Sequence, residues 1–282
     1  MNARILPYVL ILPVTLFLCL FFLYPFVLVS QQAFGSSDGG WSLDNFREVV
    51  NYWKFPISLK NTLLLAAAVV PIQLALALLM ATMVSKMGKG RDMVLYIWTI
   101  PLGISDLAAG IIWLAIFEQS GFLNSMLSGI GLIDRPMNLL TYQNPWIVFI
   151  AIALAEIWRA TAIMLVILVA GIGLIPKEYY EAADVFGAST WKQFTRITFP
   201  MLRPSLQTAL VLRVILAFEI FAVVAALGGT LFPVLMGETY AYQFDLLNSG
   251  AAAAMALIIL GISIGFTLII LRILRVPKGA SI

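Results

Sequence analysis

Six long apolar stretches, separated by more polar segments, dominate the chain. Each stretch is long enough to cross a hydrocarbon core of about 30 Å, which takes about 20 helical residues. The pattern predicts an all-α membrane protein with one transmembrane domain over residues 1–282. The six expected helices are 7–29, 61–84, 93–117, 146–175, 204–228 and 251–274. Pro71 lies within the second of these helices and Pro101 within the third, and each removes a helical hydrogen bond and can bend its helix.

A polar, amphipathic segment, 176–203, separates the fourth and fifth predicted helices. Gly187 can adopt the left-handed conformation that closes a helix. Thr190 followed by Gln193 reads as a capping box that starts a second helix. Pro200 is expected to end that second helix, because proline breaks helical hydrogen bonding. The segment is therefore predicted to form two short helices joined by a sharp turn.

This segment resembles the cytoplasmic EAA loop of ATP-binding-cassette importer permeases. The family motif is Glu-Ala-Ala, a glycine four residues after the last alanine, an isoleucine ten residues later, and then a proline. The matching residues are Glu181, Ala182, Ala183, Gly187, Ile197 and Pro200. Phe186 and Phe199 depart from the pattern, since an aspartate and a leucine are usual at these places. The resemblance implies that the loop docks on a separate ATPase subunit, and the alternative is an interfacial helix pair with no partner.

Weaker signatures, in the order found in carbohydrate importers of the maltose type, extend the resemblance along the chain. They include Tyr24-Pro25, Asn61-Thr62 and Trp158-Arg159. The resemblance implies import of a sugar or related polyol, with amino acids or metal chelates as alternatives. It also implies four kinds of contact: a second homologous permease subunit, an ATPase dimer that binds ATP and Mg, an extracytoplasmic substrate-binding protein, and lipid. The location would be a bacterial or archaeal plasma membrane.

Composition supports the membrane assignment, and charge sets the expected orientation. Of the 282 residues, 62% are hydrophobic and 11% are charged, whereas soluble domains carry roughly 25% charged residues. With the N-terminus inside, eleven of the 17 lysines and arginines lie in cytoplasmic segments, as the positive-inside rule expects. Both termini are therefore predicted to be cytoplasmic. The net charge of +3 reflects this topology and gives no basis for nucleic-acid binding.

The residue inventory excludes most catalytic chemistry. The chain has no histidine and a single cysteine, Cys19, so histidine metal sites and intrachain disulfides are excluded. The Gly88 to Arg91 segment lacks the spacing of a phosphate-binding loop, so no ATPase site is expected in this chain. Two other classes stay open: an ion-coupled secondary transporter, which carboxylates inside the membrane permit, and an intramembrane enzyme that uses a carboxylate pair.

Ionisable residues inside the predicted helices are the candidates for chemistry, because a charge at the bilayer centre costs at least about 2.5 kcal/mol. They are Asp106, Glu156, Arg159, Arg213 and Glu219. A polar cavity near mid-membrane is where transporters commonly bind substrate.

The predicted substrate-pathway residues are Asp106, Glu156, Arg213, Glu219 and Trp158. Trp158 or Trp113 is the candidate to stack on a sugar face. The alternative is structural pairing: Glu156 with Arg159 on one helix face, or Arg213 with a carboxylate on another helix.

Overall fold

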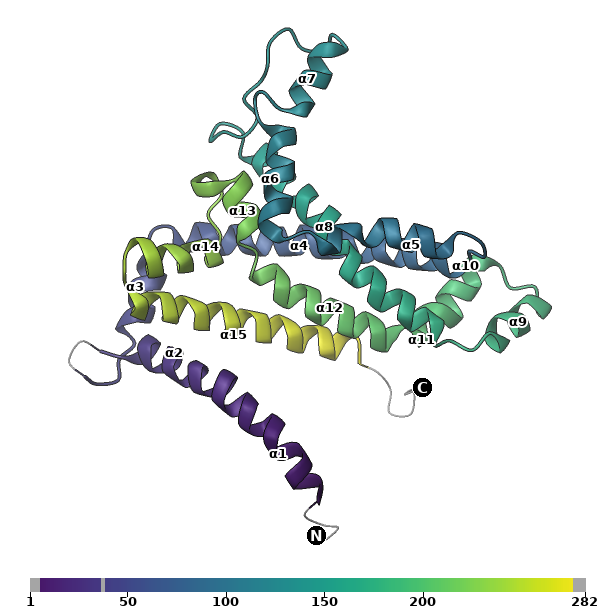
Figure 1. The fold of residues 1–282 in the computed structure, drawn as a ribbon, viewed down its shortest axis with the longest axis horizontal. Helices are drawn as coiled ribbons and strands as arrows, with labels where there is room; N and C mark the ends of the chain where they lie inside the picture. Colours follow the sequence, from purple (N-terminus) through teal and green to yellow (C-terminus); the bar gives the residue numbers. More distant parts are fainter. Residues whose placement is uncertain (1–5, 37–38, 276–282) are drawn as a thin grey trace. The chain divides into compact units, whose positions relative to one another are not determined.

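The computed structural model describes residues 6–36 and 39–275, and within those ranges all regular secondary structure is helical (Figure 1). The α-helices are α1 (Leu6–Leu18), α2 (Tyr24–Phe34), α3 (Asp44–Asn51), α4 (Phe55–Ser85), α5 (Arg91–Thr99), α6 (Asp106–Phe117), α7 (Phe122–Gly129), α8 (Pro145–Gly173), α9 (Glu178–Val185), α10 (Thr190–Gln193), α11 (Phe199–Met201), α12 (Arg203–Phe218), α13 (Ala222–Leu227), α14 (Leu235–Tyr240) and α15 (Ser249–Ile273). The short 3-10 or π segments are η1 (Cys19–Leu23), η2 (Ile100–Gly103), η3 (Phe194–Thr198), η4 (Gly229–Leu231) and η5 (Ala241–Asp245). Arg4 and Lys278, which count toward the predicted cytoplasmic charge, lie outside the described residues.

Within the described ranges, five helical stretches are long and apolar enough to cross a membrane, and a bent helix pair is a sixth candidate. The five are Tyr8–Phe34, Phe55–Ser85, Asp106–Gly129, Pro145–Gly173 and Ser249–Ile273. In the pair, Thr190–Met201 meets Arg203–Phe218 at an angle of 68°. The prediction of an all-helical membrane protein is confirmed, although several helices begin or end elsewhere than predicted.

The third predicted helix, 93–117, is broken in the structure. α5 ends at Thr99, a single 3-10 turn carries Pro101, and α6 starts only at Asp106. Pro101 cannot donate a helical hydrogen bond, and the Ser105 hydroxyl accepts from the Ala108 N–H at 3.2 Å, which caps a new helix. Asp106 therefore lies in the first turn of α6 and not midway along a continuous helix.

The fifth predicted helix, 204–228, is also interrupted. α12 ends at Phe218, the backbone is non-helical at Glu219 and again at Phe221, and α13 follows. The break lets α13 pack closely against α6. Gly110 makes this approach possible, because a Cβ at that position would lie 2.7 Å from the Ala226 Cβ. Two shorter helices, of which α13 packs against α6, thus take the place of the continuous helix that apolar length alone predicts.

The chain forms two compact units. One contains the residues up to Pro56 together with Leu235–Gly261, and the other contains Ile57–Val234 and the residues from Ile262 onward. In the second unit α4, α8 and α12 share an apolar core. Its buried members are Ala77, Ala81, Met164, Leu165, Leu168, Ile172, Leu202, Leu206 and Ala209. This core fixes the three helices that carry most of the polar layer described below.

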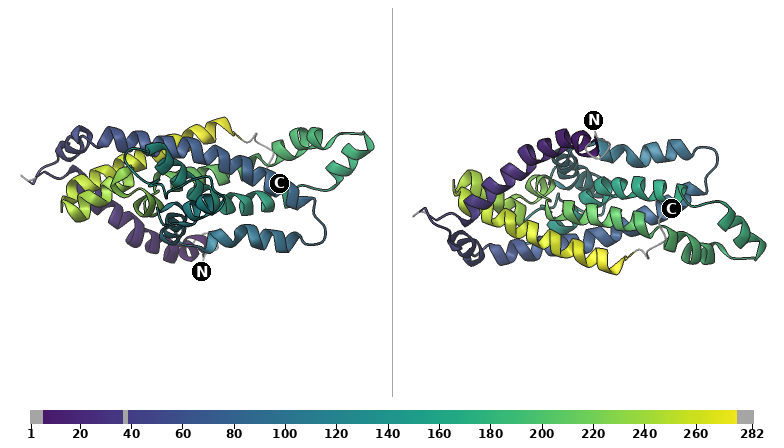
Figure 2. Two further views of the ribbon diagram at one scale, coloured as in Figure 1. Left: turned by 90° about the horizontal axis from the view of Figure 1, so that it is seen from above. Right: turned by 90° about the horizontal axis from the view of Figure 1, so that it is seen from below.

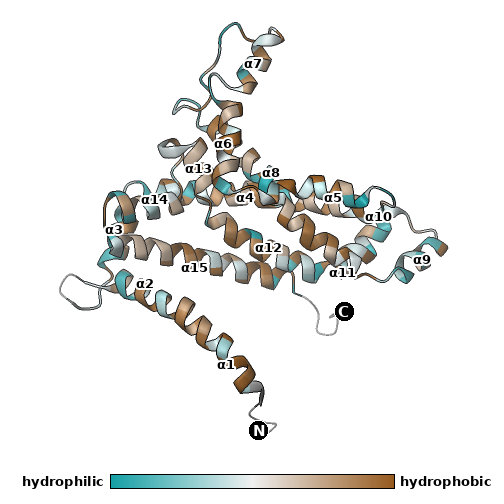
Figure 3. Ribbon diagram, in the orientation of Figure 1, coloured by the Kyte–Doolittle hydropathy of each residue, from teal (hydrophilic) through white to brown (hydrophobic). Residues whose placement is uncertain are grey.

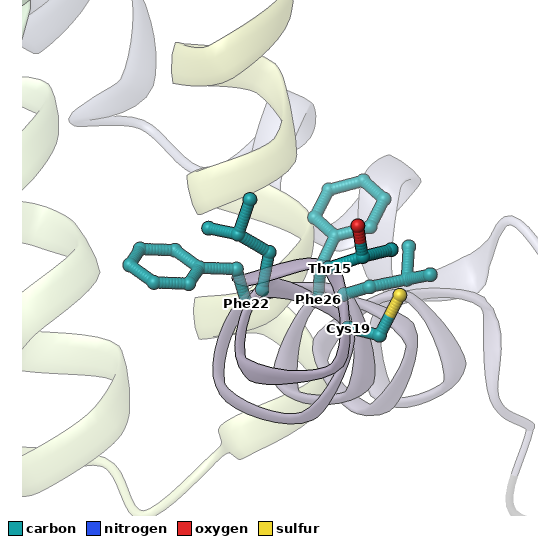
Figure 4. A pocket seen from close by; sticks show the side chains of 6 residues that line it. Thr15, Cys19, Phe22 and Phe26 are labelled. Atoms are coloured by element: carbon teal, nitrogen blue, oxygen red, sulfur yellow. The ribbon is translucent and has the colours of Figure 1, made fainter. Parts of the chain in front are cut away.

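The first unit holds a membrane-length helix that buries almost nothing within that unit. The run from α1 through η1 to α2 has no buried residue in its most apolar window. Thr15, Cys19, Phe22 and Phe26 line an open, mainly apolar depression on it (Figure 4). Its side chains are therefore available to lipid or to another subunit.

Polar contacts tie the remaining parts of the first unit together. The Asn45 amide donates to the carbonyls of Gln32, Ala33 and Gly35 at 3.1–3.2 Å, which satisfies the C-terminal end of α2. Lys54 lies 3.7 Å from Glu238 on α14. These contacts hold α3 and α14 beside the end of the first long helix without a large apolar core.

Candidate functional site

The segment between α8 and α12 forms the helix–turn–helix that the sequence predicts. α9 ends in a Schellman motif: the Gly187 N–H donates to the Asp184 carbonyl and the Ala188 N–H to the Ala183 carbonyl, both at 2.9 Å. Gly187 has φ +66°, a conformation that side chains rarely adopt. The turn is therefore fixed by backbone geometry at the glycine.

The start of α10 differs from the predicted capping box. Ser189, and not Thr190, is the N-cap, and its hydroxyl accepts from the Lys192 N–H. The Gln193 side chain donates instead to the Asp184 carboxylate, at 2.6 Å, and to the Ala188 carbonyl. The prediction was wrong by one residue because serine and threonine are adjacent and both cap helices. Gln193 links α10 to the end of α9.

Beyond α10, the helical run continues as η3 and α11 and ends at Met201, one residue after Pro200. The Tyr180 hydroxyl lies 3.0 Å from that of Thr198, which ties α9 to η3. Figure 2 shows α9 and α10, in green, extending beyond the ends of α8 and α12. Figure 3 shows hydrophilic residues on both short helices and long hydrophobic stretches along α12.

The predicted coupling residues fall into two groups in this structure. Glu181, Ala182 and Gly187 are exposed, and Ala183 is half-buried on the same helix–turn. Ile197 in η3 and Pro200 in α11 are half-buried. The exposed residues form the outer face of the loop, and the other two lie where the second helical run approaches α12.

Exposed apolar side chains on this loop were not singled out from the sequence. Val185, Phe186 and Trp191 are 85%, 89% and 72% exposed, respectively. In the motif Phe186 is only a departure from the pattern, but a large apolar residue beside a turn glycine is a signal for such a surface. Together with Glu181 they give the loop an apolar surface with an acidic group beside it, which is suited to protein contact.

A second cluster, the buried polar layer, joins α4, α8 and α12. It consists of Gln73, Glu156 and Arg213, all essentially inaccessible to solvent. Arg213 Nη2 donates to Glu156 Oε2 at 2.9 Å, and Arg213 Nε donates to the Gln73 side-chain oxygen. Gln73 Nε2 in turn donates to the Glu156 backbone carbonyl at 2.8 Å. One ion pair and one amide therefore connect three helices at a single point.

Arg159 extends this layer toward α6. It lies three residues after Glu156 on α8, with 3.5 Å between Arg159 Nη2 and Glu156 Oε1. Its Nη1 is 2.8 Å from Asp106 Oδ1. The Arg159 side chain is 16% exposed and the Asp106 side chain 51% exposed. The two arginines and two carboxylates thus form a chain of contacts that leads from the buried Arg213–Glu156 pair to the exposed carboxylate of Asp106.

Two indole rings lie on the same helices as the exposed end of this layer. The ring centroids of Trp113 on α6 and Trp158 on α8 are 6.2 Å apart, with an edge-on geometry. Trp113 also stacks on Phe117, with 6.0 Å between centroids. Trp158 is 37% exposed, so part of its ring is open to a ligand or to another chain.

The predicted pathway residues are thus divided. Glu156 and Arg213 are paired with each other and sealed inside this chain, which is the structural pairing named as the alternative. Asp106, Trp158 and Glu219 are exposed. Gln73 is not among the predicted residues, because it is not ionisable; a lone amide in a long apolar helix is the signal that identifies it.

Comparison with known proteins gives the family. Residues 73–275 match the model of the binding-protein-dependent transport system inner membrane component. The sn-glycerol-3-phosphate transport system permease protein UgpA of Agrobacterium fabrum is 30% identical, over 94% of this chain and 92% of its own. The trehalose/maltose transport system permease protein MalF of Thermococcus litoralis is 30% identical, over 83% of this chain and 79% of its own.

A solved structure agrees with these sequence matches. A bacterial ABC transporter involved in the import of the acidic polysaccharide alginate has a chain with a TM-score of 0.81 and 25% identity. The match covers 97% of this chain and 96% of the other. A multi-pass location in the plasma membrane follows from the inner-membrane family and the apolar helices. The chain belongs to the family of binding-protein-dependent transport system inner membrane components, and it is a permease subunit of an ABC importer and not an enzyme.

Proposed function

We propose that this permease subunit moves a sugar or related polyol inward by alternating access, driven by a separate ATPase that contacts the α9–α10 loop. Family membership favours this function over an ion-coupled transporter. The substrate class rests on the relatives named for trehalose and maltose, for sn-glycerol-3-phosphate and for alginate. Amino acids and metal chelates remain the alternative substrates.

The observation that carries the coupling role is the exposed helix–turn–helix with the Glu-Ala-Ala pattern on its outer face. Glu181 offers a carboxylate, and the small side chains of Ala182 and Ala183 let another backbone approach closely. The Schellman turn at Gly187 and the Gln193 bridge to Asp184 make the two helices one stiff element. A stiff element transmits a displacement from its tip to α12, whereas a flexible loop would absorb it.

The proposed pathway uses the exposed side of α6, α8 and the end of α12. Asp106 and Glu219 offer oxygen acceptors to hydroxyl groups, and Trp158 offers a ring face for a sugar ring. Glu156 and Arg213 support this surface from behind, because their pair is connected to Asp106 through Arg159. Their proposed role changes from lining the pathway to holding three helices in register.

The proposed assembly has four kinds of component. This subunit pairs with a second, homologous permease, and two ATPase subunits bind ATP and Mg on the cytoplasmic side. An extracytoplasmic binding protein delivers the substrate from the other side. Both termini and the α9–α10 loop would then be cytoplasmic, in agreement with the distribution of lysine and arginine.

The test is substrate-stimulated ATPase activity of the complete reconstituted complex with Glu181→Lys or Gly187→Asp. Glu178→Lys is the matched control, because it makes the same charge change one turn away on exposed α9. We expect Glu181→Lys and Gly187→Asp to lower the stimulation at least about tenfold, which corresponds to about 1.4 kcal/mol of lost coupling. The control should retain most of it.

Complex assembly, measured by size-exclusion chromatography, separates lost coupling from lost binding. Loosened assembly at this contact also supports the proposal, because it identifies the loop as the docking surface. Normal stimulation and transport in both loop variants would refute it and leave the loop as an interfacial helix pair.

A further inference from the structure

The two arginines of the polar layer, Arg159 and Arg213, are both engaged by carboxylates. Arg213 is fully buried against Glu156 and Gln73. Arg159 bridges Asp106 and Glu156, and only 16% of its side chain is exposed. Arg159 Nε and Arg213 Nη1 have no hydrogen-bond partner, but both nitrogens are buried, so an anion would have to displace a carboxylate to reach either guanidinium from outside. Displacement would leave that carboxylate uncompensated in a low-dielectric setting, which is costly.

The carboxylates on the same helices are more accessible than the arginines. The Asp106 side chain is 51% exposed, about three times the exposed fraction of its partner Arg159. Glu219, at the end of α12, is exposed and forms no ion pair within the part of the chain that the structure describes. A solute that approaches this surface therefore meets oxygen acceptors and negative charge first.

We propose that this subunit's share of the pathway excludes anions, so that the imported compound is an uncharged sugar or polyol and not an acidic one. The inference rests on the proposed pathway along α6, α8 and the end of α12. It separates this chain from the relatives named for sn-glycerol-3-phosphate and for alginate, whose named compounds are acidic. Neutral hydroxyl groups donate hydrogen bonds to exposed carboxylates without repulsion, whereas a phosphate or carboxylate is repelled.

The local charge can be measured with three quenchers of Trp158 fluorescence in the assembled complex in lipid nanodiscs. Acrylamide is neutral, iodide is an anion and caesium is a cation. The difference in quenching between wild type and Trp158→Phe gives the contribution of Trp158. Trp191, which is 72% exposed on the α9–α10 loop, serves as the comparison ring. We expect acrylamide to reach Trp158 and caesium to quench it at least about twofold better than iodide, after normalisation to free tryptophan.

Two substitutions should change the ratio of caesium quenching to iodide quenching in opposite directions. Asp106→Asn removes the shorter of the two carboxylate contacts of Arg159 and leaves only the contact to Glu156 at 3.5 Å. We expect iodide quenching to rise at least about twofold relative to caesium. Arg159→Gln leaves Asp106 without its counter-ion, so caesium quenching should rise relative to iodide quenching. Asp134→Asn, which removes an exposed charge from the loop after α7, is the matched control and should leave the ratio unchanged.

The outcomes separate this inference from the proposed function. If iodide quenches wild-type Trp158 as well as caesium does, the pathway does not exclude anions and the inference is wrong, while the coupling result at Glu181 is unaffected. If acrylamide does not reach Trp158, the pathway does not pass this ring, and both the proposed pathway and the inference fail. Quenching by acrylamide and caesium with weak quenching by iodide, reversed by Asp106→Asn, supports the inference.

Discussion

Replacing Arg213 with methionine removes the counter-ion of Glu156 at a point where both side chains are buried. Arg213 is fully buried, and the Glu156 side chain is 1% exposed. Removing one partner of a buried ion pair typically costs about 3–5 kcal/mol, because the remaining charge is left uncompensated. Methionine is a long apolar side chain that limits the cavity left behind. Since Arg159 still contacts Glu156 at 3.5 Å, we expect the lower end, about 3 kcal/mol of unfolding free energy.

A double-mutant cycle tests this reasoning. Wild type, Arg213→Met, Glu156→Gln and the double variant are unfolded by titration with sodium dodecyl sulfate in detergent micelles and followed by circular dichroism. The double variant leaves neither charge buried, so it should cost at least about 2 kcal/mol less than the sum of the single variants. Leu168→Met, a volume-conserving change at a fully buried position of α8, should cost less than about 1.5 kcal/mol.

The reasoning fails if the effects of the two single variants add, because the side chains would then not stabilise each other. It also fails if Arg213→Met costs no more than Leu168→Met. Either result would mean that the carboxylate and guanidinium are hydrated or separated in the folded subunit, and the polar layer would not hold the three helices together.

Two further predictions follow from close packing and from titration. Gly171→Ala should lower the free energy of unfolding by about 1–3 kcal/mol in the same titration, because the new Cβ would lie 2.2 Å from the Ser205 hydroxyl. Gly173→Ala is the control and should cost almost nothing, because its Cβ would have no atom within 4 Å. Burial raises the pKa of the Glu238 carboxyl, and Lys54 opposes part of this shift. Stability from Glu238 is therefore present at low pH and lost as pH rises from the unfolded pKa through the raised folded pKa. Glu238→Gln should flatten that dependence in thermal unfolding midpoints, and an unchanged profile would contradict the buried site.

Much of the fold could be predicted because bilayer crossing depends mainly on length and hydrophobicity. The predicted helix 146–175 is observed at Pro145–Gly173, and 251–274 at Ser249–Ile273. The breaks after Thr99 and Phe218 could not be predicted in this way. They depend on a proline turn followed by a serine cap, and on the close approach of α13 to α6, which hydropathy does not encode.

The candidate site was predictable as a set of residues but not as a set of pairs. Placing Glu156 and Arg213 at similar depths required only the rise per residue of a helix. Choosing between a pathway role and a structural pair required knowing which faces α8 and α12 turn toward each other, that is, the orientation of each helix about its own axis. The core around Leu168 and Leu206 sets that rotation, and Gln73 on α4 completes the pairing.

Arg159 gains a second role when the order of synthesis is considered. Glu156 precedes Arg213 by 57 residues. At a synthesis rate of about 5–20 residues per second, Arg213, the counter-ion of Glu156 in the finished fold, is made roughly 3–11 s after Glu156. Arg159 follows after only three residues and already lies on the same face of the nascent helix. It supplies a local counter-ion while α8 enters the membrane, before α12 exists. The pairing three residues apart is therefore suited to insertion, and the pairing between helices to the finished subunit.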